Sequence, residues 1–159
     1  MSTLERIREF LNRNRDLAFE MIRIYLGLGL FAKGVYFAGH MEEVLVLVHE
    51  GQLVVSANIM AHYVVVAHLV GGLMLAAGLA TRLAAAVQVP VLVGAVFLVH
   101  IREGLFARAQ NLEFAVLVLF LLVLAALVGG GRLSWDYYLA RRDDAKLEEA
   151  RSEPVVGSR

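Results

Sequence analysis

Four long apolar runs, separated by short polar segments, dominate the pattern of this chain. They cover about 17–39, 59–80, 83–101 and 112–130. An α-helix rises ~1.5 Å per residue, so a run of about twenty residues is long enough to cross the ~30 Å hydrocarbon core of a bilayer. The pattern therefore predicts an all-α integral membrane protein, in which a four-helix bundle occupies residues 17–136.

The shorter segments outside these runs are expected to lie at the membrane surface. Residues 1–16 gather apolar side chains on one helical face and place arginines elsewhere, which is typical of an amphipathic interfacial helix. Residues 40–58 contain an apolar piece that is too short to cross a bilayer, so we expect an interfacial or re-entrant segment. Residues 137–159 form a charged tail, for which a frayed helix is expected.

The distribution of basic residues predicts the orientation of the bundle. Four arginines precede the first run, Arg82 lies in a tight turn expected at Thr81 and Arg82, and six basic residues follow the fourth run. The other two connections hold Arg102 and Arg108. Because basic residues concentrate in cytoplasmic loops, both termini are predicted to be cytoplasmic. The expected location is the inner (plasma) membrane, with multiple passes.

Composition narrows the classes of function. The chain is 59% hydrophobic and carries 15 basic and 15 acidic residues. This balance provides no extended positive surface, so no nucleic-acid partner is expected. Since cysteine is absent, disulfides, thiolate metal sites and a Cys-x-x-Cys redox relay are excluded. The sequence also contains no metal-ligand motif and no haem motif.

Ionisable residues inside the apolar runs are the candidate functional groups, because an ionisable group at mid-bilayer costs about 2.5–3.5 kcal/mol on insertion scales. Arg23 lies toward the inner side, with Glu20 one turn away as its expected partner. The predicted topology places five further residues toward the outer side, with contributions from all four runs: Lys33, His62, His68, His100 and Glu113.

These residue types predict a binding site for a quinone head group in the outer half of the bundle. Neutral imidazole beside a carboxylate can donate and accept both the hydrogen bonds and the protons that quinone reduction requires. Catalytic roles are therefore expected for His68, His100 and Glu113. Cofactor-binding roles are expected for Lys33, His62 and Arg23. No electron carrier is recognisable as a motif, so the electrons would come from a partner.

Several of these residues also have a purely structural interpretation. His62 and His100 fit interfacial positions with a wet ring tip, and Glu113 fits a helix start, where a carboxylate complements the helix dipole. Glu20 and Arg23 fit a structural pair. Paired histidines also leave haem ligation open. Six glycines are interpreted as packing positions that let helices approach closely: Gly27, Gly29, Gly34, Gly71, Gly72 and Gly78.

Five short motifs follow one another along about residues 20–136. They are IRIYLGLGLFAKG with Arg23, GGLMLAAGLATRLAA, FLVHIREGLF with His100, Glu113-Phe114, and GGGRLSWD. In this order and spacing they resemble the DoxX family of small four-span membrane proteins, many of which carry a glutamate where this chain has His68. The resemblance implies association with membrane redox chemistry, including subunits of thiosulfate:quinone oxidoreductase and of respiratory or detoxification complexes.

Two functions from different classes are therefore expected. In the first, the chain is a membrane subunit associated with quinone-linked redox chemistry, and whether it belongs to the catalytic part of such a complex stays open. In the second, it is a non-catalytic subunit that assembles or stabilises a larger membrane complex. The expected partners are the lipid bilayer and either other redox-complex subunits or further copies of the chain.

Overall fold

The structure is a computed structural model that describes residues 5–6, 15–50, 56–102 and 111–152. Within these ranges every regular element is a helix and no strand occurs. Most of the interfacial helix predicted at 1–16 lies outside the described residues. The helices from Arg15 onward are α2 (Arg15–Gly39), α3 (Met41–Glu50), α4 (Ala57–Val66), η1 (Ala67–Gly71), α5 (Gly72–Ala77), α6 (Thr81–Gly94), η2 (Ala95–Val99), η3 (His100–Arg102), α7 (Asn111–Val128) and α8 (Trp135–Ser152).

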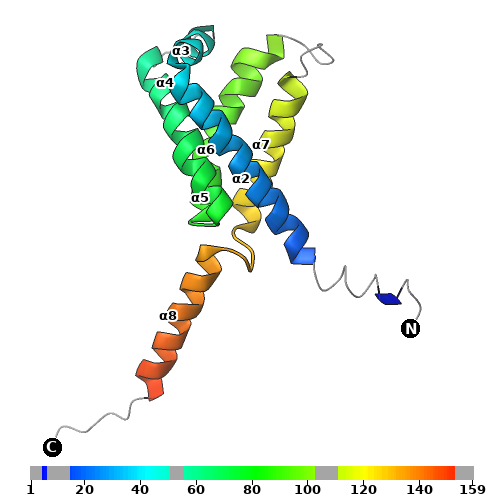
Figure 1. The fold of residues 1–159 in the computed structure, drawn as a ribbon, viewed down its shortest axis with the longest axis vertical. Coiled ribbons are helices and arrows are strands. Elements are labelled where there is room, and N and C mark those ends of the chain that lie inside the picture. Colours follow the sequence, from blue (N-terminus) through cyan, green and yellow to red (C-terminus); the bar gives the residue numbers. More distant parts are fainter. Residues whose placement is uncertain (1–4, 7–14, 51–55, 103–110, 153–159) are drawn as a thin grey trace, which may run out of the picture.

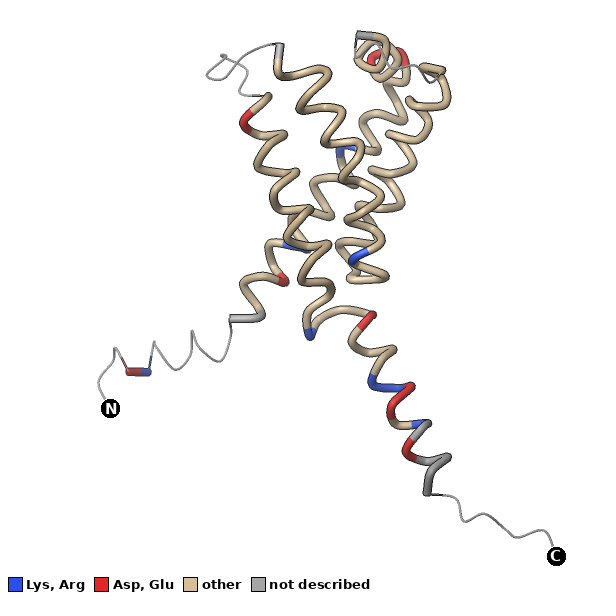
Figure 2. Tube along the Cα trace, turned by 180° about the vertical axis from the view of Figure 1, so that it is seen from behind, with Lys and Arg blue, Asp and Glu red and all other residues tan. Residues whose placement is uncertain are grey.

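The four predicted spans are confirmed as helices that are long and apolar enough to cross a membrane. The described residues contain such helices at Leu17–Gly39, Ala57–Ala77, Thr81–Val99 and Asn111–Val128. Their outer faces carry large apolar side chains, as a lipid-facing surface requires. In Figure 2 most of the bundle is free of charged residues, which lie mainly near the start of α2, near the end of α7, on α3 and along α8.

Within the segment 40–58 that was predicted not to cross the membrane, Met41–Glu50 form the short helix α3, and residues 51–55 lie outside the described residues. Figure 1 shows α3 lying across one end of the bundle, opposite the end from which α8 extends. Val44 and Val48 of α3 are buried against Phe37 of α2 and Ala61 and Val65 of α4. The apolar residues of this segment therefore cover the end of the α2–α4 pair.

The turn between the second and third spans lies three residues earlier than predicted. Gly78 has φ 71° and Ala80 has φ 43°, so the chain reverses at Gly78–Ala80. Thr81 already belongs to α6. The prediction of a turn at Thr81 and Arg82 was wrong because the charge of Arg82 marks the end of the span, whereas the left-handed backbone at Gly78 makes the reversal.

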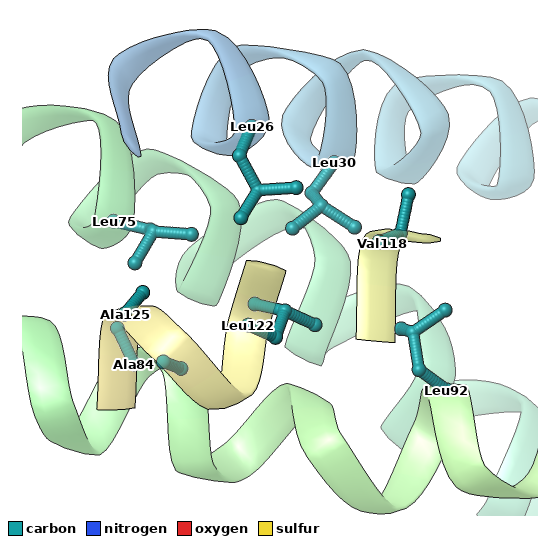
Figure 3. Close-up of a cluster of buried hydrophobic side chains, with 9 residues drawn as sticks. Leu26, Leu30, Leu75, Ala84, Leu92, Val118, Leu122 and Ala125 are labelled. Carbon is teal, nitrogen blue, oxygen red and sulfur yellow. The ribbon is translucent and has the colours of Figure 1, made fainter. Parts of the chain in front are cut away.

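Small residues and leucines form the interior of the bundle. Figure 3 shows one buried cluster drawn from four helices, consisting of Leu26, Leu30, Leu75, Ala84, Ala85, Leu92, Val118, Leu122 and Ala125.

Where α2 crosses α5, a Cβ atom on Gly72 would lie 2.5 Å from the backbone nitrogen of Phe31 and 2.9 Å from the carbonyl oxygen of Gly27. The two backbones touch, which confirms the packing interpretation for this pair. It is wrong for Gly29, which is exposed and has no atom within 4 Å of a Cβ position.

Candidate functional site

Lys33 and His68 both contact the ring of Phe37. The Lys33 Nζ atom lies 4.8 Å from the centroid of the Phe37 ring, and the His68 ring meets the same ring edge-to-face at 5.4 Å between centroids and 73° between planes. Gly34 makes this approach possible, because a Cβ at Gly34 would lie 2.9 Å from the carbonyl carbon of His68. Two of the predicted site residues, from the first and second spans, therefore share one site.

His68 is held in one orientation by its own helix. Its side chain is 6% exposed, and Nδ1 lies 2.9 Å from the carbonyl oxygen of Val64. A carbonyl oxygen can only accept, so a neutral imidazole donates from Nδ1 and keeps the lone pair of Nε2 available. His68 lies within the π-helical turn η1, a geometry that occurs often at functional sites.

Lys33 is exposed, and its ammonium group lies over two aromatic rings. The second ring is that of Tyr36, at 5.6 Å from Nζ to the centroid. The Tyr36 hydroxyl donates to the Glu43 carboxylate at 2.9 Å, and the Tyr36 ring stacks on His40 at 4.2 Å between centroids. The site therefore offers one positive donor at Lys33 and one acceptor at His68 beside a flat apolar ring.

His62 lies apart from this site. It is exposed on α4, and its Nδ1 is 2.7 Å from the carbonyl oxygen of Asn58 in the preceding turn. In the described part of the chain no hydrogen bond or ring contact joins His62 to Lys33, Phe37 or His68. The geometry favours its interfacial interpretation.

His100 and Glu113 lie on two elements that contact each other, η3 and α7. Both side chains are partly buried. Glu113 is in the first turn of α7, where its carboxylate complements the helix dipole. The residues predicted for the outer site thus fall into two pairs, with Lys33 and His68 on α2 and η1, and His100 and Glu113 on η3 and α7.

Arg23 and Glu20 occupy the opposite end of the bundle and are each 1% exposed. The Arg23 guanidinium donates from Nη1 to the carbonyl of Leu75 at 3.1 Å and from Nη2 to that of Leu133 at 3.3 Å. The Glu20 carboxylate accepts from the backbone N–H of Leu133 at 2.9 Å. The two residues therefore meet through one backbone segment, and no ion pair joins them directly within the described residues. Because both side chains bond to Leu133, the opposite charges of Glu20 and Arg23 lie close together.

Asp136 connects this polar cluster to the turn between α5 and α6. Its carboxylate accepts from the backbone N–H groups of Ala80 at 2.6 Å and Thr81 at 2.8 Å, and its own N–H donates to the carbonyl of Gly78 at 3.1 Å. A side chain at Gly78 would overlap Arg23 and Ser134, and one at Gly131 would overlap Glu20. The GGGRLSWD motif is therefore a structural joint between α7 and α8.

Sequence reasoning gave no role to Gln88, although the structure makes it unusual. Gln88 is 0% exposed in the middle of α6, and neither its amide oxygen nor its amide nitrogen has a hydrogen-bond partner. Its position as a polar residue within the third apolar run was the available signal. The described residues also contain no group of three or more His, Cys, Asp or Glu side chains that could hold a metal ion.

Comparison with known protein families agrees with the resemblance carried by the motifs. The model of the DoxX family matches residues 18–101. That match covers more than half of the 159 residues and includes α2, α6 and the His68 turn. Comparisons with curated proteins and with solved structures gave no match. The family match, together with four membrane-spanning helices, shows that the chain belongs to the DoxX family.

Proposed function

We propose that this chain is a DoxX-type membrane subunit that binds a quinone head group at Lys33 and His68 and serves quinone-linked redox chemistry. The observation that carries the proposal is the placement of a donor and an acceptor against one aromatic ring, with Lys33 and His68 both in contact with Phe37. The predicted orientation, with both termini cytoplasmic in the inner membrane, would put this site in the outer half of the bilayer.

The chemistry of the site fits a quinone. The Lys33 ammonium can donate to a carbonyl oxygen, and the Nε2 lone pair of His68 can accept from the hydroxyl of the reduced form. The Phe37 ring supplies a flat apolar contact for the head group. A bound quinone would supply two-electron, two-proton redox chemistry, which the side chains of this protein lack. Electrons would then have to reach the site from another subunit, since the sequence contains no recognisable electron-carrier motif.

His68, His100 and Glu113 are the groups that would hold or move protons. The Nε2 atom of His68 can receive a proton from the reduced head group while Nδ1 stays bonded to Val64. His100 and Glu113 lie at neighbouring helix ends, partly buried, where they could exchange protons with water. The family's association with membrane redox complexes supports this assignment.

The test is binding of decylubiquinone, a short-tailed benzoquinone, to the purified protein in lipid nanodiscs. We expect His68→Leu to weaken binding at least about tenfold, which corresponds to ~1.4 kcal/mol, as expected for one lost hydrogen bond. His49→Leu is the matched control, because His49 is an exposed histidine on α3. Equal affinities of wild type and His68→Leu would contradict the proposal.

The attachment of α8 favours a second candidate function, the assembly of a larger membrane complex. Helix α8 extends from the bundle in Figure 1, and its first turn is fixed by Ser134, whose hydroxyl accepts from the N–H of Tyr137 at 3.1 Å. Trp135 and Tyr138 on this helix are 58% and 56% exposed. Loss of copurifying subunits on removal of residues 137–159, with quinone binding intact, would favour this function.

A further inference from the structure

Gln88 lies at the centre of an unusual contact between α6 and η1. Its side chain packs on the backbone of Gly71, where a Cβ atom would lie 3.0 Å from Nε2 and 3.2 Å from Cγ of Gln88. The amide is completely buried, and both of its polar atoms lack hydrogen-bond partners. Buried amides are nearly always hydrogen-bonded to other protein groups. Without such a bond, the amide would lose its hydrogen bonds to water on burial and gain nothing in exchange.

The two elements around Gln88 are irregular. Gly71 ends the π-helical turn η1, which also contains His68. Pro90 lies two residues after Gln88 and cannot donate the N–H that a regular helix needs at that point. The π-helical turn and Pro90 are thus two departures from regular α-helical hydrogen bonding on the two elements that enclose Gln88.

Beside this contact, one hydrogen bond links α4 to α6 among the residues that the structure describes. The Tyr63 hydroxyl donates to the carbonyl oxygen of Val87, the residue before Gln88, at 2.6 Å. Tyr63 and Val87 are each 37% exposed, so the bond lies at the outer surface of the helix pair, which lipid would cover. Tyr63 is therefore placed to hold the two helices together on that side.

From these observations we propose that Gln88 is a binding residue for the carbonyl or hydroxyl groups of a quinone head group, and that the described structure is the closed state of this site. The inference rests on the proposed function and extends it. His68 and Gly71 belong to the same π-helical turn, so a head group held at His68 Nε2 lies on the element against which Gln88 packs. Opening of the Tyr63 bond would let the Gln88 amide form the hydrogen bonds that it lacks.

The decisive variant is Gln88→Leu, compared with Thr81→Val as a matched control. Thr81 lies two turns earlier on α6, is also 0% exposed, and has a hydroxyl without a partner. Both variants remove an unpaired buried polar group, so both are expected to keep or raise the melting temperature. We expect Gln88→Leu alone to weaken decylubiquinone binding, by about tenfold. A merely structural glutamine would instead lower the melting temperature and leave the affinity unchanged.

Two further measurements make the inference decisive. In protein labelled with side-chain 15N-glutamine, Gln52 and Gln110 provide internal reference signals, and decylubiquinone should shift the amide signal that is missing in Gln88→Leu. Tyr63→Phe should increase the association rate about two- to tenfold, as expected for loss of one closing hydrogen bond. Wild-type binding with an unshifted Gln88 signal and full affinity in Gln88→Leu overturns this inference alone. Absence of any binding to wild type overturns the proposed function and this inference together.

Discussion

The two ends of the bundle use buried charged and polar residues in opposite ways. Around Arg23, side-chain groups bond to backbone groups of other elements, including the carbonyls of Leu75 and Leu133. The His68 ring itself has one described hydrogen bond, which runs to Val64 in the same helix, and Nε2 keeps its lone pair. The Arg23 end also keeps unpaired atoms, since Glu20 Oε2, Arg23 Nε and the Thr81 hydroxyl have no hydrogen-bond partner among the described residues. What distinguishes the two ends is the partner: the bonds of Arg23 and Glu20 run to distant backbone and hold the fold together, whereas the bond of His68 stays within its own helix.

The first prediction concerns which end of the bundle faces the cytoplasm. Labelling of single cysteines with a thiol reagent gives an all-or-none answer. The native chain has no cysteine, so single cysteines report cleanly. We expect Glu42→Cys, on α3, to react with an impermeant thiol reagent added outside the cell, and Lys146→Cys, on α8, to react only after the membrane is opened. Both native residues are exposed. The reverse pattern would place the His68 site in the inner half of the bilayer.

The largest effect on stability is expected at Arg23. Arg23→Met removes two bonds to backbone carbonyls and leaves the Glu20 carboxylate buried without its positive neighbour. Removing one partner of a buried charge pair typically costs about 3–5 kcal/mol. We expect a strong loss of melting temperature or yield, measured by thermal unfolding in detergent.

The double variant Arg23→Met with Glu20→Gln is the control for this prediction. It should recover part of the loss, because the remaining buried group is then neutral. If Arg23→Met alone unfolds at the same temperature as wild type, the cluster does not hold the bundle together, and the contrast between the two ends fails.

Much of the fold could be predicted from the sequence, because the bilayer imposes a minimum length on each span. The four spans, the short segment at 40–58 and the close packing at Gly27 and Gly72 follow from hydropathy and residue size. The turn at Gly78–Ala80 was misplaced, since nothing local reveals that Asp136 binds the N–H groups of Ala80 and Thr81, which precede it by 56 and 55 residues.

The candidate site was predictable only in part, for a related reason. Depth along a span can be counted, so Lys33 and His68 were both expected in the outer half of the bundle, and both contact Phe37. Rotation about each helix axis depends on packing, which is why His62 was grouped with His68 although it is exposed and bonded within α4. Gln88 was overlooked because an unpaired amide is visible only once its neighbours are known.

The smallest of the predicted losses of stability is expected at Asp136, which lies at the Arg23 end of the bundle. Asp136→Ala removes two hydrogen bonds to the N–H groups of Ala80 and Thr81, which begin α6. A bond to a charged group contributes about 1.5–3 kcal/mol, and water can replace part of it at this partly exposed position. We therefore expect a loss of about 2 kcal/mol in the free energy of unfolding, with quinone affinity unchanged because His68 lies in a different part of the bundle.

Asp143→Ala, an exposed aspartate on α8, should have no measurable effect on either quantity. His68→Leu should show the opposite pattern, with affinity lost and stability kept. If Asp136→Ala weakens quinone binding as much as His68→Leu does, the two ends are energetically coupled, and the division into a structural end and a binding end is wrong.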